Sequence, residues 1–329
     1  NGEYKLSDVP LGRHTMRVSY IGYKEQTIPN IMVTSGKEVV VNFQMEENII
    51  QTDEVVVRAE NDKTATNNEM AVISARSFNL EEAMRYAGSR NDPSRMAMNF
   101  AGVSGANDSR NDIIIRGNSP TGLLWRMEGI EIFNPNHFGL QGTTGGPVSM
   151  LNTNLLEKSD FLTGAFPANY GNATSGVFDL QMRRGNNEKR EYLGQVGFNG
   201  FELGAEGPFS KNSKAAYLIN YRYSTLGIFK ALGIPFGAGQ AVPQYQDITF
   251  KFDLPTTKAG RFSLFGMGGL SHVDLVNSKL DTTKKSVNFY GDPLRDSYFK
   301  SNMGIVGLSH LYFLNNSTYS KLVIAVSGT

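Results

Sequence analysis

The sequence contains no cysteine, few charged residues and no long apolar run. Without cysteine there can be no disulfide, no thiolate nucleophile and no cysteine-based metal site. Charged residues make up 19% of the chain, below the roughly 25% that is usual for soluble domains. Lys and Arg number 32 and Asp and Glu 31, so charge gives no reason to expect nucleic acid as a partner. No stretch approaches the roughly 18 apolar residues of a transmembrane helix.

A catalytic constellation is also lacking. The sequence has no Gly-x-Ser-x-Gly elbow, no Gly-rich phosphate loop and no zinc motif. Its four histidines lie in different segments without metal-like spacing: His14, His137, His272 and His310. We therefore predict a protein that is not an enzyme, with no catalytic residue, no bound metal and no cofactor.

Glycine and aromatic residues are abundant instead. Glycine accounts for 35 of the 329 residues and aromatics for 11%, as many short turns and strands half exposed to lipid would require. The chain opens on Asn1 within a strand-like pattern and shows no signal peptide. Because an exported protein needs such a signal, we expect the N-terminus to have been processed or trimmed.

Residues 1–48 have the pattern of short β-strands without a helical period. Met16, Val18 and Tyr20 alternate with the residues between them, which predicts one strand. Another is expected where four apolar residues share a face: Val39, Val41, Phe43 and Met45. Because these strands are too few to cover two sheets, we predict only part of a β-sandwich.

Residues 49–188 read as a linker followed by a small α+β domain. The polar run 58–68 offers nothing to bury, so 49–68 has linker composition. Asn79 can cap a short helix, and Asp92-Pro93 opens another with proline at the first helical position. Strands are expected at 112–116, 123–133, 155–162 and 176–182.

Residues 189–329 have an all-strand pattern of about seven strands, the first two short. Apolar residues at 248, 250, 252 and 254 alternate with polar ones. Short turns at 208–213, 255–260 and 315–318 alternate with long loops at 226–246 and 275–297. Composition alone favours a soluble β-sandwich, because alternating strands are a weak membrane signal. Short turns on one side and long loops on the other are typical of an outer-membrane barrel, and the preceding domain decides between the two interpretations.

Two motifs in that domain carry a resemblance to a known family. The first is Ile115-Arg116-Gly117, followed by Met127-Glu128-Gly129-Ile130. The second runs from Leu156-Glu157 through Tyr170-Gly171 to Ser175-Gly176-Val177. In this order they resemble the plug domain of TonB-dependent outer-membrane receptors, with Met127-Glu128 in place of the usual Leu-Asp. The run Gly2–Leu6 and the later Tyr20-Ile21-Gly22-Tyr23 resemble the end of a carboxypeptidase-regulatory-like domain.

The resemblance implies a mainly β chain of four parts. They are a partial transthyretin-like β-sandwich (1–48), a linker (49–68), an α+β plug domain (69–188) and the first strands of a large antiparallel transmembrane β-barrel (189–329). About seven strands cannot close around a plug, since barrels that hold one have about 22. We therefore expect the polypeptide to continue past Thr329.

The resemblance also implies structural roles for the motif residues. Four glycines are expected to permit tight turns or positive φ where strands reverse: Gly117, Gly129, Gly171 and Gly176. Arg116 is expected to pair with a carboxylate between plug and barrel, with Glu157 or Asp160 as candidates. Tyr170 belongs to the closing motif of the plug.

Two functions follow from different readings of such a barrel. The first is an energised importer in the outer membrane of a Gram-negative bacterium. Its N-terminal domain would lie in the periplasm and its partner would be a TonB-type energy-coupling protein. The ligand would be a metal chelate, a cobalamin-like cofactor, a glycan or a peptide. The second is a structural subunit of an outer-membrane assembly, with outer-membrane lipid, a surface lipoprotein or other subunits as partners. Neither involves nucleic acid.

The loops after the two plug strands, 118–122 and 134–146, are expected at the extracellular apex of the plug. Five residues there offer donors, acceptors and an aromatic face for a small polar ligand: Asn134, Asn136, His137, Phe138 and Gln141. The alternative, given equal weight, is that these loops only seal the plug against the barrel.

The segment Asp53-Glu54-Val55-Val56-Val57 resembles the TonB box of receptors that carry the extra N-terminal domain. Its β-branched residues favour an extended strand, and the polar linker beside it gives freedom to move. It is therefore predicted to add as an edge strand to the periplasmic partner. The alternative is that 55–57 form the last strand of the sandwich or pack under the plug.

Overall fold

The computed structural model describes residues 4–20, 23–33, 38–43, 45, 74–78, 88–89, 92–105, 107–140, 142–197, 200–211, 213–224, 243–276, 295–315 and 318–329. The chain forms two compact units, Asn1–Ala65 and Thr66–Thr329. No helix among these residues is long and apolar enough to cross a membrane. The linker, the segment 53–57, the helix expected from Asn79 and Gln141 all lie outside the described residues.

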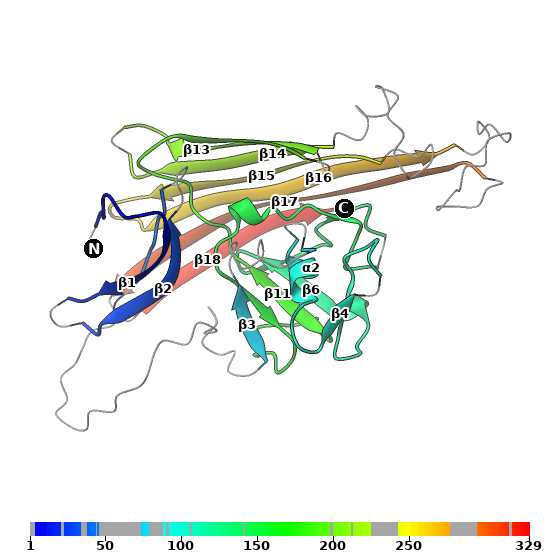
Figure 1. Cartoon of the computed structure of the whole chain (residues 1–329), viewed down its shortest axis with the longest axis horizontal. Helices are drawn as coiled ribbons and strands as arrows, with labels where there is room; N and C mark the ends of the chain where they lie inside the picture. Colours follow the sequence, from blue (N-terminus) through cyan, green and yellow to red (C-terminus); the bar gives the residue numbers. More distant parts are fainter. Residues whose placement is uncertain are drawn as a thin grey trace. The chain divides into compact units, whose positions relative to one another are not determined.

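The first unit contains one antiparallel pair, β1 (Gly12–Val18) and β2 (Gln26–Val33) (Figure 1). The prediction of a strand around Met16 and Val18 is confirmed. The strand predicted over residues 39–45 is wrong, because 38–43 and 45 pair with no strand in the structure as described. Tyr4 holds this segment instead: its hydroxyl donates to Val41 O over 2.8 Å, and its ring lies 5.3 Å from that of Phe43.

The second unit begins with a five-stranded sheet of order β3-β10-β11-β6-β7 (Figure 1). Its strands are β3 (Ala75–Phe78), β10 (Ser159–Leu162), β11 (Gly176–Leu180), β6 (Leu123–Met127) and β7 (Ile130–Ile132). Only the β11–β6 pair is parallel. Two short pairs accompany the sheet: β4 (Val103–Gly105) with β5 (Ile113–Ile115), and β8 (Asn136–His137) with β9 (Val148–Ser149). The 3-10 helices are η1 (Pro120–Gly122) and η2 (Thr153–Leu155).

Local signals explain several of these elements. Asp92 caps α2 (Pro93–Ala97), accepting a hydrogen bond from Ser94 N over 2.9 Å, as its position before proline predicted. The strand expected over 123–133 is a hairpin instead, because Glu128 and Gly129 both have positive φ, 55° and 92°. Two successive positive φ values are typical of a tight type I′ turn. The first residues of the strand expected over 155–162 belong to η2 and the bend after it.

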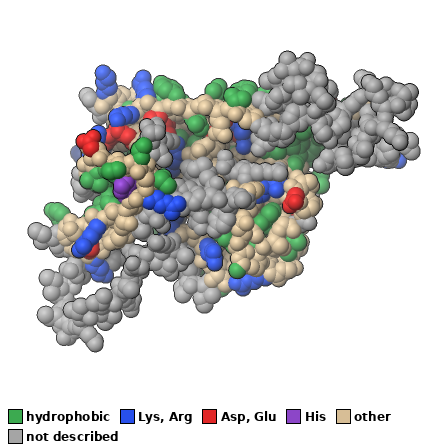
Figure 2. Space-filling view, in the orientation of Figure 1, with side chains coloured by type: hydrophobic (Ala, Val, Ile, Leu, Met, Phe, Trp, Pro, Cys, Tyr) green, Lys and Arg blue, Asp and Glu red, His purple; other side chains and the backbone are tan. Residues whose placement is uncertain are grey.

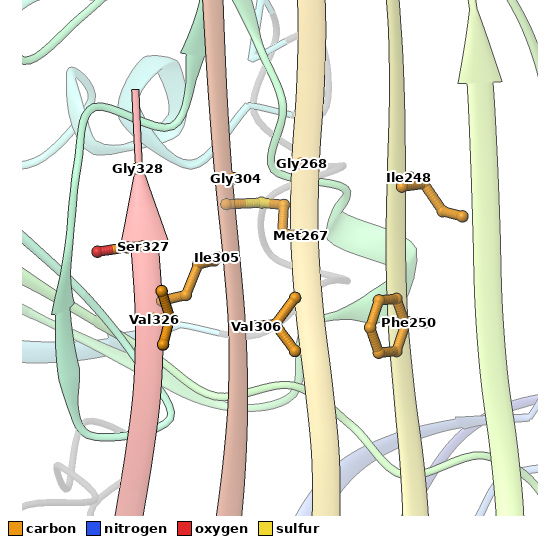
Figure 3. Close-up of a pocket in the computed structure, with 10 residues that line it drawn as sticks. All are labelled: Ile248, Phe250, Met267, Gly268, Gly304, Ile305, Val306, Val326, Ser327 and Gly328. Carbon is orange, nitrogen blue, oxygen red and sulfur yellow. The ribbon is translucent and has the colours of Figure 1, made fainter.

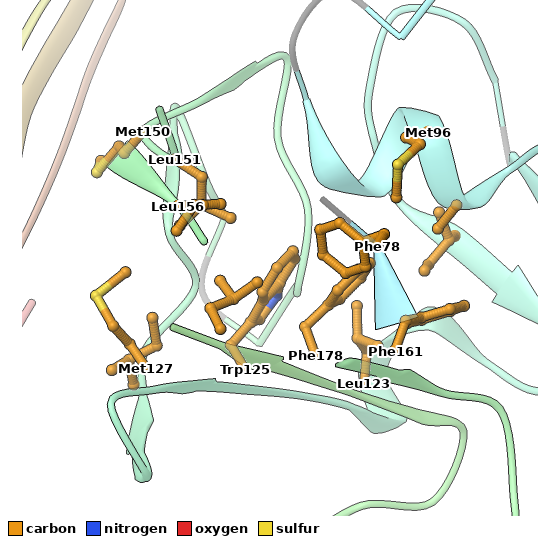
Figure 4. Close-up of a cluster of buried hydrophobic side chains, with 14 of the residues drawn as sticks. Phe78, Met96, Leu123, Trp125, Met127, Met150, Leu151, Leu156, Phe161 and Phe178 are labelled. Atoms are coloured by element: carbon orange, nitrogen blue, oxygen red, sulfur yellow. The ribbon is translucent and has the colours of Figure 1, made fainter. Parts of the chain in front are cut away.

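The plug core is built around stacked aromatic rings (Figure 4). The ring of Phe178 on β11 lies 4.5 Å from that of Trp125 on β6 and 4.4 Å from that of Phe161 on β10. All three side chains are buried. Because truncating a buried Phe to Ala costs about 3–5 kcal/mol, this stack is a main source of the sheet's stability.

Residues 191–328 form a second sheet of seven antiparallel strands in chain order (Figure 1). The strands are β12 (Glu191–Gly197), β13 (Gly200–Pro208), β14 (Ala216–Tyr223), β15 (Gln244–Pro255), β16 (Arg261–Leu275), β17 (Ser297–Asn315) and β18 (Thr318–Gly328). The predicted strand number is thus confirmed, and the first two are short. Most of the two predicted long loops, residues 225–242 and 277–294, lies outside the described residues.

The alternation along β15 is inside out relative to a soluble protein. Asp247 and Lys251 are buried on the face that meets the plug, whereas Ile248 and Leu254 on the other face are 45% and 39% exposed. Hydrophobic side chains also line the upper edge of the molecule, where Figure 1 places β13 and β14 (Figure 2). A soluble sandwich would bury its apolar face. The sheet is therefore a lipid-facing barrel wall and not half of a sandwich.

Candidate functional site: the plug–barrel interface

The wall presents two different surfaces to the plug. On β13–β15 the buried residues are largely polar: Glu206, Asn220, Asp247, Thr249, Lys251 and Asp253. On β16 and β17 apolar side chains join the plug core instead: Phe265, Met267, Met303 and Ile305. At Gly269 the plug touches the wall backbone, since a Cβ there would lie 2.7 Å from both His137 Cε1 and Met150 Sδ. The plug is thus held by an ionic half and an apolar half of the same wall.

A buried ion pair joins the β6–β7 turn to β15. Lys251 Nζ donates to Glu128 Oε1 over 2.8 Å and to Met182 O over 2.6 Å. Glu128 Oε1 also accepts from Met182 N over 2.8 Å. Both charged side chains are only 7% exposed. Removing one member of such a pair leaves an uncompensated buried charge, which costs about 3–5 kcal/mol.

A second buried cluster surrounds Asp247 on β15. His137 Nε2 lies 2.8 Å from Asp247 Oδ2, and Arg222 on β14 donates to the same oxygen from Nε and Nη2, over 2.9 and 2.8 Å. Arg222 Nη2 also donates to Ser149 O on the plug. Burial lowers the pKa of His137, although the hydrogen bond to Asp247 opposes this effect. Since Arg222 already pairs with Asp247, a neutral imidazole can donate to this carboxylate from Nε2, while its buried Nδ1 has no hydrogen-bond partner among the described residues.

A third ionic contact lies near the end of the plug. Arg183 donates to Glu206 on β13 through both terminal nitrogens, over 2.6 and 2.7 Å, and Asn186 N donates to the same carboxylate over 3.0 Å. Bidentate Arg–carboxylate pairs are among the stronger and more directional ionic contacts. This contact fixes the point at which the chain passes from plug to barrel.

The apex residues proposed for ligand contact have partners within the protein. Phe138 N donates to Ser271 Oγ on β16 over 3.2 Å, and His137 is fully buried against Asp247. Asn136 is buried, donates to Asn134 Oδ1 over 2.7 Å and accepts from Asn111 over 2.7 Å. For His137 and Phe138 this geometry favours the sealing alternative. Ligand contact by any of the five residues stays a prediction.

The contacts of Arg116 among the described residues are with hydroxyl groups, and its expected pairing with a carboxylate stays a prediction. Its Nη2 donates to Ser74 Oγ over 2.7 Å and to Thr163 Oγ1 over 3.4 Å, and the described part of the chain gives it no ion pair. Arg116 itself has a φ of 51°, so the turn it forms with Gly117 directs its side chain toward exposed hydroxyls. The side chain of Glu157, one expected partner, is exposed.

The backbone conformations expected for the motif glycines are found at two positions and differ at two others. Gly117 and Gly129 have positive φ, 80° and 92°, as expected. Gly171 does not, because the left-handed residue of its turn is Asn172. Gly176 also lacks positive φ, but a Cβ there would lie 2.3 Å from Ile115 Cδ1, so it permits close strand packing. Tyr170 is buried, and its hydroxyl donates to Asp179 Oδ2 over 2.8 Å.

No pattern in the sequence identified the residues that bind the plug to the wall. Lys251 and Asp247 were visible only as the polar members of an alternating strand. Glu128 was visible only as a departure from the motif's usual aspartate. Their partners lie 123 and 110 positions away in the chain, a separation that no local pattern encodes.

A plug domain bound to the polar inner face of an inside-out antiparallel sheet defines a plugged outer-membrane β-barrel. The model of the TonB-dependent Receptor Plug Domain matches residues 66–177, and that of the CarboxypepD_reg-like domain matches residues 1–57. The chain belongs to the TonB-dependent receptor family, and its plug domain follows a carboxypeptidase-regulatory-like domain. This family consists of outer-membrane receptors and transporters, not enzymes.

Solved structures of outer-membrane receptors align with parts of the chain at low identity. The Ferric-Catecholate import receptor Fiu from E. coli K12 aligns with a TM-score of 0.51 and 15% identity, over 77% of this chain and 38% of its own. The ferric enterobactin receptor PfeA from Pseudomonas aeruginosa aligns with a TM-score of 0.49 and 16% identity, over 78% and 40%. The chain thus spans about 40% of the length of that receptor. No curated protein matches the chain.

Proposed function

We propose that the protein imports a ligand across the outer membrane as an energised, plugged barrel. One observation carries this proposal: the plug has a sheet of its own on the inner side of the wall and contacts the wall through side chains, and the described residues form no backbone ladder between the two sheets. Side-chain contacts can be exchanged without unfolding either sheet. This is what a reversible plug requires.

The membrane orientation follows from the loops. Outer-membrane barrels have short periplasmic turns and longer extracellular loops, so the turns after β13, β15 and β17 would face the periplasm. The sandwich (1–48) would then lie in the periplasm. Along the chain it would be followed by the linker (49–68), the plug (69–188) and the barrel strands (189–329). This division is part of the proposal.

Energy coupling would act through Asp53-Glu54-Val55-Val56-Val57. An extended segment pairs by its backbone with an edge strand of a TonB-type protein, and such pairing can bear force. Pulling would reach the plug at β3, the edge strand of its sheet, which pairs only with β10.

The ligand class remains open among metal chelates, cobalamin-like cofactors, glycans and peptides. Fiu is named as a ferric-catecholate import receptor, but at 15% identity its ligand gives this chain a candidate only. The informative experiment is growth of a deletion strain on one member of each class as the limiting nutrient. A specific defect on one class, restored by the receptor gene, supports import. Growth equal to the parent on every class contradicts it.

The apolar half of the wall favours a second candidate, a barrel that serves as a scaffold. Phe265 and Ile305 are at most 2% exposed and pack in one cluster with plug residues such as Met127. Such a contact would hold the plug in place permanently. Isolation of a stable complex with other outer-membrane proteins, together with the absence of any growth defect, would support this function over import.

A further inference from the structure

An apolar groove of about 430 Å³ lies on the outward face of β15–β18 (Figure 3). Its floor consists of three glycines directly opposite one another on neighbouring strands: Gly268, Gly304 and Gly328. A Cβ built on Gly304, between β16 and β18, meets no atom within 4 Å. The described side chains therefore leave this floor open.

Exposed apolar side chains form the walls of the groove. Ile248 and Phe250 on β15 lie along one side, and Val306 and Val326 lie at one end. The Phe250 ring covers Gly266, where a Cβ would lie 2.6 Å from its Cζ, so this wall is held in position. Since Ile248 is 45% and Val306 50% exposed, the groove opens outward, away from the plug.

A basic pair lies on the same face, toward the long-loop end. His272 on β16 and Lys300 on β17 are directly opposite each other. Lys300 is exposed and precedes Gly304 by four positions, about 13 Å along a strand and about 10 Å in depth at the usual tilt. Asp274, the nearest outward carboxylate on β16, lies two positions farther from the groove. The outward residues nearest the groove are Leu270 and Asn302, which carry no charge.

We propose that this face binds one phosphorylated glycolipid of the lipid A type. An acyl chain occupies the glycine floor, and a phosphate binds Lys300 and His272. The choice of leaflet rests on the proposed orientation, in which the long loops are extracellular and the adjoining leaflet is glycolipid. The depth of the groove agrees with this assignment. The distance of about 10 Å from the basic pair to the glycine floor is less than half of a hydrocarbon core of about 30 Å, so an acyl chain can reach the floor within one leaflet. A cation about 10 Å above an apolar groove complements a phosphorylated acyl lipid better than it does a protein surface.

Filling the groove tests the acyl-chain contact. Gly304→Leu places a side chain in open space, and Gly194→Leu on β12 is a matched control, since a Cβ at Gly194 also meets no atom within 4 Å. The receptor is purified from outer membranes in mild detergent, and retained lipid A is measured by native mass spectrometry. Displacing about two buried methylene groups should lower retention about tenfold in Gly304→Leu, with no change in Gly194→Leu. Equal retention in the two variants overturns the proposal.

A second variant is modified only after the protein has folded, so its result does not depend on how the substitution affects folding. The 329 residues contain no cysteine, so Val326→Cys can be capped with a bulky maleimide after purification. Capping should expel the lipid from this variant but not from Val196→Cys, an exposed position on β12. A disulfide-linked dimer through Cys at 326 would instead identify a second copy as the occupant and contradict the lipid.

The phosphate contact is tested with lipid A and its dephosphorylated form. Lys300→Gln should abolish the preference for the phosphorylated lipid while retention of the dephosphorylated form stays unchanged. An unchanged preference overturns the headgroup assignment. All of these measurements read bound lipid and not uptake, so failure of the import proposal would leave their outcome interpretable.

Discussion

Lys251 of the barrel wall and Glu128 of the plug turn form an ion pair of 2.8 Å, with both side chains buried. Glu128 occupies the left-handed position of a two-residue turn, with a φ of 55°. Its side chain is thereby directed across the interface toward β15. The backbone conformation of this plug turn therefore determines a contact that holds the plug against the barrel wall.

Replacing either partner alone should loosen the plug more than replacing both. Glu128→Gln keeps an acceptor for Met182 N but leaves the Lys251 charge without its carboxylate, and Lys251→Met leaves the Glu128 carboxylate without its cation. Each should lose about 3–5 kcal/mol, whereas the uncharged double variant should lose less than either. Unfolding can be followed by the emission of Trp125, the single tryptophan of the 329 residues, which is buried in the plug. Losses that simply add in the double variant would show that the two residues are not coupled.

Acidification should weaken the plug through His137. Burial lowers the pKa of His137 in the folded protein, so below about pH 6.5 the unfolded chain binds this proton more readily. The stability is fully present above the ordinary pKa and falls as pH drops below it. In His137→Gln, which retains an amide donor, the part of the pH dependence of stability that comes from His137 should be absent between pH 7.5 and 5.5, as measured by thermal unfolding. An identical pH dependence in the variant would remove His137 from the explanation.

Combined replacement of Asn136, His137 and Phe138 by alanine separates the two roles of the apex. If these residues seal the plug, as their burial favours, the barrel should admit bulky antibiotics while ligand affinity stays near normal. If they contact the ligand, affinity should fall and the permeability barrier should hold. Antibiotic sensitivity and ligand binding, measured on the same inserted protein, decide between the roles.

Proline at position 56 should abolish uptake. Val56→Pro removes a backbone donor and blocks strand pairing, while membrane insertion and ligand binding should stay intact. Val56→Thr, which keeps the N–H and strand propensity, is the matched control and should transport normally. Normal uptake by the proline variant would exclude this segment as the coupling strand and shift weight to the scaffold function.

The sequence predicted where strands form better than it predicted which face of a sheet is covered. The alternation along β15 indicated a strand, but the same pattern suits a soluble sandwich or a barrel, and only the burial of Asp247 and Lys251 shows which face is inside. Register and facing depend on what covers each side of a sheet, which one strand's sequence does not record. The prediction of a strand over 39–45 was wrong for a related reason. An alternating pattern forms a strand only where a partner strand pairs with it.

Site residues were predictable only where a local turn required them. Gly117 and Gly129 were found because positive φ is a property of two or three neighbouring residues. The hydroxyl contacts of Arg116 were not predicted, because they are made with Ser74 and Thr163, 42 and 47 positions away. The Arg183–Glu206 pair was missed for the same reason, although both residues lie in well-defined segments.

The order of charges along β15 has a consequence for assembly. Because side chains on one face repeat every second residue, the smallest slip that keeps this face inward is two residues. Such a slip would place Asp253 or Thr249, in place of Lys251, opposite Glu128. One error confronts a carboxylate with a carboxylate and the other leaves Glu128 without a cation. A plug displaced by two residues along β15 therefore loses this ion pair, so the pair that holds the plug also selects one position of the plug against the wall.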